Sequence, residues 1–305
     1  MKFPLSKYIW FDGKLVPVNM AKVPVTTHAI HYGTSIFEGI RAYWNSKNLH
    51  VFRLKDHVKR FRNSGKFYNI KLNFSDRQIE NAVIDLCKKN KIKKSCYIRP
   101  FYFVGQYGIN FHVTQKAPTH TAIFAFPFGD LFNKSGITAT ISKWRKFSDM
   151  STPTQAKMGG NYLNSILATQ DAKQRGFDEA ILLDQSGNVS EAPGENIFLV
   201  KNNMLVTPSL SSSALDGITR RSIITLAKDM KLKIKTQKVS KKELKMADEI
   251  FLSGTAAEIT PVIKIDKKKI GEGKVGNITK LFMATYSDIV MNKSENYSHW
   301  LTVVY

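Results

Sequence analysis

The chain has 305 residues, of which 43% are hydrophobic, and a formal net charge of +22. It has no apolar run near the about 20 residues that a membrane-spanning helix requires, and its two cysteines, Cys87 and Cys96, are too few for a disulfide framework. These properties exclude membrane-spanning and disulfide-stabilised secreted proteins, and they favour a cytoplasmic protein with a substantial core.

The histidines and the positive charge each suggest an alternative that the rest of the sequence does not support. His28 and His31 are the closest histidine pair, but no cysteine or glutamate lies near them to complete a metal site. The charge would attract polyanions such as nucleic acids. Its lysines, however, form short clusters, and no helix-turn-helix, RNP or zinc-finger pattern is present. We therefore interpret the charge as a solvated lysine-rich surface.

The N-terminal half is predicted to form strands and hairpins with two helices. Asp12 and Gly13 supply the positive φ angles of a type I′ turn. Ser75 and Gln78 form a capping box ahead of an apolar helical face, and aromatic and β-branched residues indicate strands. The predicted elements are a hairpin at 8–16, helices at 54–68 and 75–90, and strands at 96–105 and 121–126.

The pattern changes at Pro127-Phe128-Gly129, where an apolar strand gives way to a polar, glycine-containing stretch. Domain boundaries commonly fall in stretches of this kind. The predicted organisation is a small N-terminal α+β domain at 1–127, an interdomain loop at 128–136, and a larger α/β domain at 137–305.

The second half reads as an α/β enzyme rather than a repeat array. Gly176 is expected to close its first helix, and Asp216-Gly217 to open its second. Turn residues at 185–188 and 201–203 suggest that the three strands around them form a meander. The predicted elements are strands at 137–144, 180–184, 197–200, 204–207 and 249–252, and helices at 162–174, 216–231 and 277–291.

Four loops in this half place glycine beside polar residues, an arrangement in which scaffolds often hold catalytic groups. Taken singly, each has an ordinary explanation, because a lysine in a basic chain is usually solvated and a carboxylate in a turn is usually exposed. One loop opens a helix whose positive end suits a phosphate, yet none matches a Walker A loop or a dinucleotide fingerprint. The loops contain Lys157 before a double glycine, Glu191 and Glu195, Leu215 to Arg220, and Ser253 to Glu258.

Together the loops are more specific, because a lysine nucleophile, a lone carboxylate and two anion-binding turns are the parts that pyridoxal phosphate requires. With three of these loops and three further segments, the chain resembles the class IV aminotransferases, most closely the bacterial branched-chain amino-acid aminotransferases. The resemblance runs from Tyr8 to about Tyr286, in family order and at family spacing. Its segments are 28–33, 37–41, 97–100, 157–162, 190–196 and 253–261.

This resemblance implies a fold-type IV enzyme, with the D-amino-acid aminotransferase-like fold and pyridoxal 5′-phosphate between its domains. Lys157 would be the Schiff-base lysine, in a site that lowers its pKa by desolvation or nearby cations. Glu191 would keep the pyridine nitrogen protonated, Tyr162 would hydrogen-bond the phenolic oxygen, and Arg60 would pair with the phosphate. The implied catalytic residues are Lys157, Glu191 and Tyr162, and the cofactor-binding set adds Arg60, Leu215, Gly217, Ile218, Thr219 and Thr255.

The implied substrate residues indicate L-amino acids. In the branched-chain family a Tyr-x-Arg pair addresses carboxylates, and Tyr97 and Arg99 match it. D-amino-acid aminotransferases instead place an arginine and a histidine two apart there, which this chain does not. The turn at Thr255-Ala256 would hold the α-carboxylate, and Arg99 the distal carboxylate of glutamate. The implied substrate-binding residues are Tyr32, Phe37, Gly39, Tyr97, Arg99, Phe111, Phe128, Thr255 and Ala256.

Two positions depart from the family pattern. Phe128 stands where the bacterial family often has a tryptophan, and Leu131 where it often has an aromatic residue. Because a methylene group contributes only about 1–3 kcal/mol to discrimination, these changes leave the ranking among branched-chain and aromatic substrates open.

The expected reaction is reversible ping-pong transfer of an amino group from L-leucine, L-isoleucine or L-valine to 2-oxoglutarate, giving L-glutamate. A homodimer or larger homo-oligomer is also implied, since Phe111 would reach the partner subunit's site, and no membrane or specific nucleic acid is expected. One alternative is a relative acting on D-amino acids, or a lyase making an aromatic acid from an aminated chorismate. The other is a basic nucleic-acid-binding protein built on the same scaffold.

Overall fold

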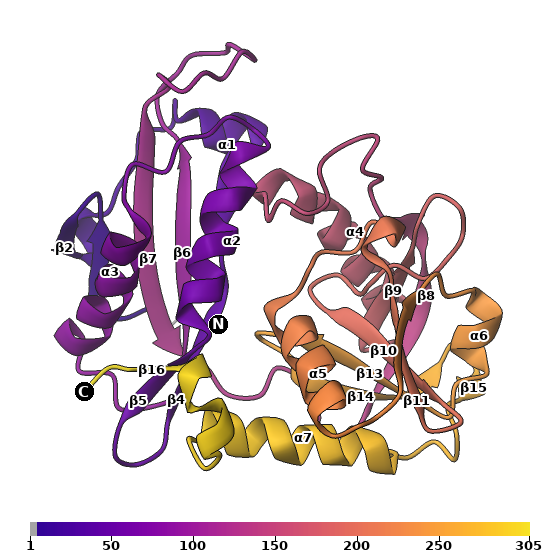
Figure 1. The fold of residues 1–305 in the computed structure, drawn as a ribbon. Coiled ribbons are helices and arrows are strands. Elements are labelled where there is room, and N and C mark those ends of the chain that lie inside the picture. The colour runs from indigo at the N-terminus through magenta and orange to yellow at the C-terminus, as the bar shows by residue number, and fades with distance from the viewer. Residues whose placement is uncertain (1–4) are drawn as a thin grey trace. The chain divides into compact units, whose positions relative to one another are not determined.

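The computed structural model describes residues 5–305, which fold into two compact units (Figure 1). Unit 1 comprises the described residues up to Gly129 together with Ala156–Gly160 and Asp288–Tyr305, and unit 2 comprises Asp130–Gln155 and Asn161–Ser287. Lys157 therefore belongs to unit 1. The predicted domains at 1–127 and 137–305 stay a prediction, and they differ from these units in where they place residues 156–160 and 288–305.

Unit 1 is built on an eight-stranded sheet with the order β16-β5-β4-β6-β7-β1-β2, in which β3 also pairs with β6. The hairpin predicted at its start is confirmed, with φ angles of 44° at Asp12 and 91° at Gly13. The strands are β1 (Tyr8–Phe11), β2 (Lys14–Pro17), β3 (Ser35–Phe37), β4 (Ile40–Trp44), β5 (Leu49–Phe52), β6 (Cys96–Val104), β7 (Thr119–Pro127) and β16 (Leu301–Val303).

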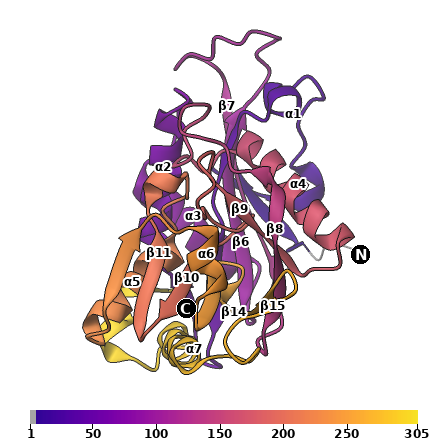
Figure 2. The same cartoon turned by 90° about the vertical axis from the view of Figure 1, so that its right-hand side faces the viewer.

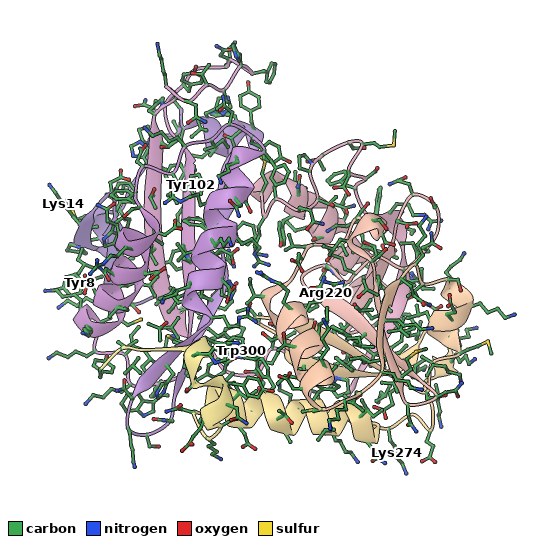
Figure 3. All side chains as sticks on the ribbon, viewed as in Figure 1. Tyr8, Lys14, Tyr102, Arg220, Lys274 and Trp300 are labelled. Atoms are coloured by element: carbon green, nitrogen blue, oxygen red, sulfur yellow. The ribbon has the colours of Figure 1, made fainter. Side chains whose placement is uncertain are left out.

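Helices α2 (Leu54–Lys66) and α3 (Asp76–Lys89) pack on this sheet (Figure 1). The predicted capping box is confirmed, because the Ser75 side chain accepts from the Gln78 N–H while the Gln78 side chain accepts from the Ser75 N–H. Tyr102 of β6, labelled in Figure 3, meets Phe61 of α2 edge-on, with ring centroids 4.8 Å apart. Helix α1 (His28–Tyr32) was not predicted.

Unit 2 contains a mixed sheet with the order β12-β11-β10-β13-β14-β8-β9, and β15 pairs with β14. Its strands are β8 (Ile137–Arg145), β9 (Glu179–Leu183), β10 (Asn196–Lys201), β11 (Met204–Pro208), β12 (Ile234–Gln237), β13 (Glu249–Gly254), β14 (Glu258–Ile265) and β15 (Lys268–Lys269).

The remaining α-helices, in chain order over both units, are α4 (Tyr162–Gln174), α5 (Ile218–Asp229), α6 (Lys241–Lys245) and α7 (Asn277–Val290). The 3-10 turns are η1 (Val18–Met20), η2 (Gly159–Asn161), η3 (Leu210–Ser212) and η4 (Glu295–Trp300).

The predicted three-strand meander is wrong for β9. Strands β10 and β11 form a hairpin, but β9 lies at the opposite edge of the sheet and pairs in parallel with β8. Parallel neighbours need a crossover connection, and α4, which packs on β8 and β9, provides it (Figure 2). The turn at residues 185–188 is real, but a local turn signal does not determine which strands pair.

Within residues 5–305, no helix is long and apolar enough to cross a membrane. No group of three or more histidine, cysteine, aspartate or glutamate side chains in that range could hold a metal ion. Cys87 and Cys96 are buried free thiols.

Candidate active site

Lys157 lies on a segment of unit 1 that main-chain contacts hold in place. The Phe37 N–H donates to the Lys157 carbonyl at 3.1 Å, and the Lys157 N–H donates to Ser64 Oγ of α2 at 3.0 Å. Met158 forms an antiparallel bridge with Ile36 of β3. The backbone beneath the lysine is therefore fixed by a strand and a helix.

The double glycine after Lys157 allows this segment to approach α1 and β3 closely. A Cβ atom on Gly159 would lie 2.3 Å from Ser35 Oγ, and the Gly160 N–H donates to the Gly33 carbonyl at 3.2 Å. Gly33 has a φ of +65°, and a Cβ atom there would lie 2.9 Å from Gly160 Cα. A side chain at Gly159 or Gly33 would push the lysine segment away, whereas a Cβ atom on Gly160 would come no closer than 3.6 Å to its neighbours.

Arg60 of α2 forks onto Glu38, which follows β3. Its Nε lies 2.6 Å from Glu38 Oε1 and its Nη2 lies 2.8 Å from Oε2, while His57 Nδ1 also contacts Oε2 at 2.7 Å. Burial alone would raise the pKa of the Glu38 carboxyl, but Arg60 and His57 hold that pKa well below its usual range. Burial is the largest influence on the pKa of His57 and lowers it, Glu38 raises it, and Arg60 and Lys157 lower it again, so that the pKa lies below its ordinary value. Glu38 is therefore ionised and His57 is neutral at pH 7.

Phe37 places two predicted site cations on one ring. Arg99 Cζ and Lys157 Nζ each lie 4.7 Å from its centroid, and Arg99 Nη2 donates to the Tyr97 hydroxyl at 3.1 Å. Gly39 makes room for that tyrosine, because a Cβ atom on Gly39 would lie 1.8 Å from the Tyr97 hydroxyl oxygen. The Nε of Arg99 is buried with no hydrogen-bond partner among residues 5–305, which fits a site for an anionic ligand.

The other predicted substrate residues of unit 1 are aromatic. Phe128 is half-buried, and its ring centroid lies 5.5 Å from that of Tyr97. Tyr32 and Phe111 meet edge-on at 5.1 Å, yet they are 36% and 80% exposed. Phe111 thus presents most of its surface to solvent in this chain.

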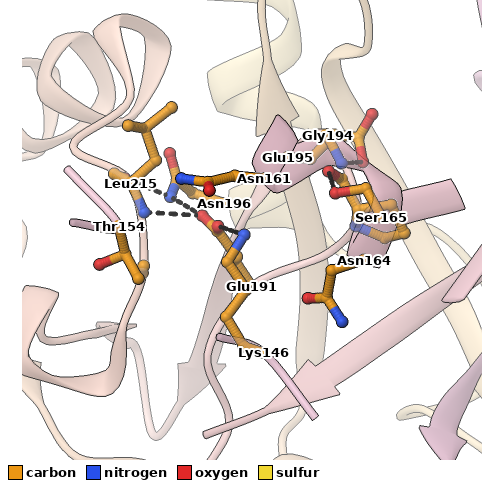
Figure 4. Close-up of polar contacts among 12 residues, drawn as sticks. Lys146, Thr154, Asn161, Asn164, Ser165, Glu191, Gly194, Glu195, Asn196 and Leu215 are labelled. Atoms are coloured by element: carbon orange, nitrogen blue, oxygen red, sulfur yellow. Dashed lines mark hydrogen bonds and ion pairs between the residues drawn. The ribbon is translucent and has the colours of Figure 1, made fainter. Parts of the chain in front are cut away.

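In unit 2, three partners surround the Glu191 carboxylate (Figure 4). Lys146 is the residue that follows β8, and its Nζ lies 2.6 Å from Oε1. The Asn196 side chain donates to Oε2 at 3.1 Å and the Leu215 N–H donates to it at 2.9 Å. The side chain is only 6% exposed, so a buried carboxylate is here balanced by a lysine and two neutral donors.

Helix α5 begins beside this carboxylate. The Asn196 side chain also donates to the Leu215 carbonyl at 2.8 Å, and a Cβ atom on Gly217 would lie 2.0 Å from Asn196 Oδ1. Gly217 is the N-cap, makes no side-chain cap, and precedes a first turn without acidic residues that begins with Ile218 and Thr219. First-turn N–H groups in that setting suit a phosphate.

The loops of Glu191 and Thr255 lie against each other. A Cβ atom on Gly254 would lie 3.2 Å from both Glu195 Cγ and the Gly194 carbonyl oxygen, and Thr255, which follows, is half-buried while Ala256 is similarly placed. Ser165 Oγ of α4 donates to the Pro193 carbonyl at 2.7 Å. This bond connects α4, which begins at Tyr162, to the loop of Glu191.

The structure thus collects the predicted residues into two sets, one in each unit, and adds four that sequence reasoning missed. Glu38, His57, Lys146 and Asn196 each contact a predicted site residue or its direct partner. A sequence signal existed for His57, which lies three residues before Arg60 on one helical face, and for Asn196, which ends the Glu191 loop. None existed for Lys146, 45 residues before Glu191 in a lysine-rich chain.

The chain is similar to known proteins over most of its length. The family model of amino-transferase class IV matches residues 35–265. The branched-chain-amino-acid aminotransferase of Escherichia coli (strain K12) is 42% identical over 303 residues, which cover 98% of each chain.

Two solved structures are similar over almost the whole chain. The branched-chain aminotransferase of Thermoproteus uzoniensis with norvaline has a TM-score of 0.96 and 41% identity, covering 98% of this chain and 100% of that one. The branched-chain amino acid aminotransferase of Thermobaculum terrenum in its PLP-form has a TM-score of 0.93 and 32% identity, covering 100% of each chain. This chain belongs to the class IV aminotransferases and, within them, to the branched-chain amino-acid aminotransferases.

Proposed function

We propose that the protein is a pyridoxal-phosphate-dependent branched-chain amino-acid aminotransferase. It transfers the amino group of L-leucine, L-isoleucine or L-valine reversibly to 2-oxoglutarate. The observation that carries this proposal is the Glu191 network, a buried carboxylate paired with Lys146 beside a helix start without a side-chain cap, in a chain that matches such enzymes over 98% of its length.

The residues present fit pyridoxal 5′-phosphate. Arg60 supplies a cation and the first turn of α5 supplies N–H groups without a competing acidic residue, which is the chemistry of a phosphate site. When bound, the cofactor supplies an electron sink for the substrate Cα. The residues that hold it are Arg60, Lys157, Tyr162, Glu191, Leu215, Gly217, Ile218, Thr219 and Thr255.

Three side chains have catalytic roles in this proposal. Lys157 Nζ would hold the cofactor covalently and, once the amino group of the substrate has displaced it, would take the proton from the substrate Cα and return it during transfer. Glu191 keeps the pyridine nitrogen protonated, and Tyr162 orients the cofactor through its phenolic oxygen. The backbone-fixed segment of Lys157 supports this role, because it leaves the amino group as the part of that residue that moves.

Substrate recognition divides between polar and apolar groups. Thr255 and Ala256 bind the α-carboxylate, and Arg99 with Tyr97 binds the distal carboxylate of glutamate. The buried Arg99 Nε without a partner in the described chain supports the second assignment. Aromatic and glycine residues form the pocket for the branched side chain, namely Tyr32, Phe37, Gly39, Phe128 and Tyr162.

We further propose a cytoplasmic homodimer or larger homo-oligomer. Phe111, 80% exposed, would complete the site of the partner subunit, since an aromatic ring left so exposed is more stable when covered. Cys87 and Cys96 are free thiols, as expected in a reducing compartment. Gel filtration that returned a fully active monomer would contradict the oligomer.

The visible absorption spectrum of the purified protein tests the proposed activity. We expect a band from bound cofactor that bleaches when L-leucine is added and persists when D-alanine is added. Bleaching by D-alanine alone would instead support a D-amino-acid enzyme. A protein that shows no band even after addition of pyridoxal 5′-phosphate would contradict the proposal.

A further inference from the structure

The carboxylate of Glu38 lies in the core of unit 1 with its side-chain contacts directed at α2. Its side chain is fully buried, with an exposed fraction of 0%. Oε1 accepts from Arg60 Nε, while Oε2 accepts from Arg60 Nη2 and is contacted by His57 Nδ1. Because both oxygens are occupied and shielded from solvent, Glu38 is poorly placed to exchange protons with a substrate, so an acid–base role does not explain it.

We infer that Glu38, supported by His57, is a positioning residue that sets the orientation of the Arg60 guanidinium for phosphate binding. This inference rests on the proposed function, in which Arg60 holds the cofactor phosphate. A guanidinium is a planar fork, so contacts through Nε and Nη2 fix its plane.

The helix that carries Arg60 makes this arrangement specific. His57, Arg60 and Ser64 are spaced by three and four residues and therefore share one face of α2. That face binds Glu38 through its first two members and receives the Lys157 N–H through the third. The phosphate-binding cation and the lysine backbone are thus held in register by a single helix face.

The energetics also favour a positioning role over a stabilising one. A buried ion pair often contributes less to stability than apolar residues of the same volume, because desolvation offsets the Coulomb attraction. What such a pair does provide is order, since an unrestrained arginine must lose side-chain entropy when it binds an anion. Glu38 and His57 remove that loss before the ligand arrives.

The test compares binding of pyridoxal 5′-phosphate and of pyridoxal, which lacks the phosphate, to the full chain freed of cofactor. The ratio of the dissociation constant of pyridoxal to that of pyridoxal 5′-phosphate reports the contribution of the phosphate alone. We expect Glu38→Gln to lower this ratio roughly ten- to a hundredfold, the range of a hydrogen bond to a charged group. His57→Leu should lower it by a smaller factor, and Arg60→Gln should abolish most of it.

A double-mutant cycle separates positioning from general damage. If Glu38 acts through Arg60, Glu38→Gln has no further effect on the ratio in the Arg60→Gln background. Asp76→Asn is the matched control, because Asp76 pairs at 2.5 Å with Arg62, a second arginine of α2, but is 47% exposed; it should leave the ratio unchanged. Near-ultraviolet circular dichroism verifies that each variant is folded. If Glu38→Gln does not fold, His57→Leu takes its place as the test variant.

The outcomes distinguish this inference from the proposed function. An unchanged ratio in folded Glu38→Gln and His57→Leu, or equal weakening of both ligands, would overturn the positioning role while leaving Arg60 in place. An unchanged ratio in Arg60→Gln would overturn both the phosphate role of Arg60 and this inference. A wild-type chain that binds neither ligand would overturn the proposed function, and with it the inference.

Discussion

Lys146 Nζ lies 2.6 Å from Glu191 Oε1, and the two side chains are only 13% and 6% exposed. The residue proposed to face the cofactor nitrogen is therefore paired with a lysine from a distant part of the chain. Because Asn196 and Leu215 occupy only Oε2, Lys146 balances the charge on the other oxygen.

Lys146→Met should destabilise the protein by roughly 1–3 kcal/mol, the cost of leaving a buried polar group without its partner. Urea denaturation measures this. Lys143→Met is the control three residues earlier, since Lys143 is 67% exposed and lies 3.8 Å from Asp171; it should change stability by less than about 0.5 kcal/mol. Equal losses in the two variants would contradict a special role for Lys146.

Lys157→Ala should abolish amino transfer and leave the fold intact. The contacts that hold this segment use the Lys157 main chain, which alanine retains, whereas covalent cofactor binding requires the amine. Activity and the absorbance of the bound cofactor should both disappear while the melting temperature of the cofactor-free protein changes little. Turnover at the wild-type rate would refute the assignment.

Gly33→Ala should impair both stability and activity. The new Cβ would meet the Gly160 backbone at 2.9 Å in a residue with a φ of +65°, and we expect a loss of about 1–3 kcal/mol from the overpacking. Gly176→Ala separates the effect of the positive φ angle from that of the steric clash, because Gly176 has a φ of +79° but nothing within 4 Å of its Cβ position. It should cost about 1 kcal/mol and keep full activity; a similar loss of activity there would argue against displacement of the lysine segment.

Arg99→Gln should weaken the reaction with 2-oxoglutarate more than the reaction with L-leucine. If Arg99 binds the distal carboxylate, kcat/KM for 2-oxoglutarate should fall roughly ten- to a hundredfold. The half-reaction with L-leucine, which has no such carboxylate, should change far less, and Arg62→Gln, at an exposed ion pair, should change neither. Stopped-flow measurement of each half-reaction decides this, and equal losses for both substrates would rule out the assignment.

Stability should fall as the pH drops from neutrality, in part through Glu38 and His57. Glu38 has a folded-state pKa well below its ordinary value of 4.5, so its contribution is present above that value and is lost below it. Burial lowers the pKa of His57 below its ordinary 6.5. As the pH falls below 6.5, His57 therefore takes up a proton in the unfolded chain but not in the folded chain. This difference lowers the stability of the folded state.

Urea denaturation between pH 7.5 and pH 4 checks both contributions. His57→Asn should flatten the dependence just below pH 6.5, and Glu38→Gln should flatten it below pH 4.5. A wild-type stability that rises on acidification over this range would contradict the assigned signs.

The sequence by itself determined the local elements and the chemical identity of the site. The type I′ turn at Asp12-Gly13 and the capping box of Ser75 and Gln78 form as predicted, because each depends on residues only a few positions apart. The motifs around Lys157 and Glu191 sufficed for the family, since they retain its residue types and spacing.

Only the tertiary structure decided which elements meet. The place of β9 beside β8 depends on a helical crossover, and the contacts of Lys146 with Glu191 and of Glu38 with Arg60 join residues 45 and 22 positions apart. A lysine or a glutamate carries no local mark of its eventual partner, because the pairing depends on strand order and helix packing. These contacts determine how the carboxylate and the arginine of the site are held.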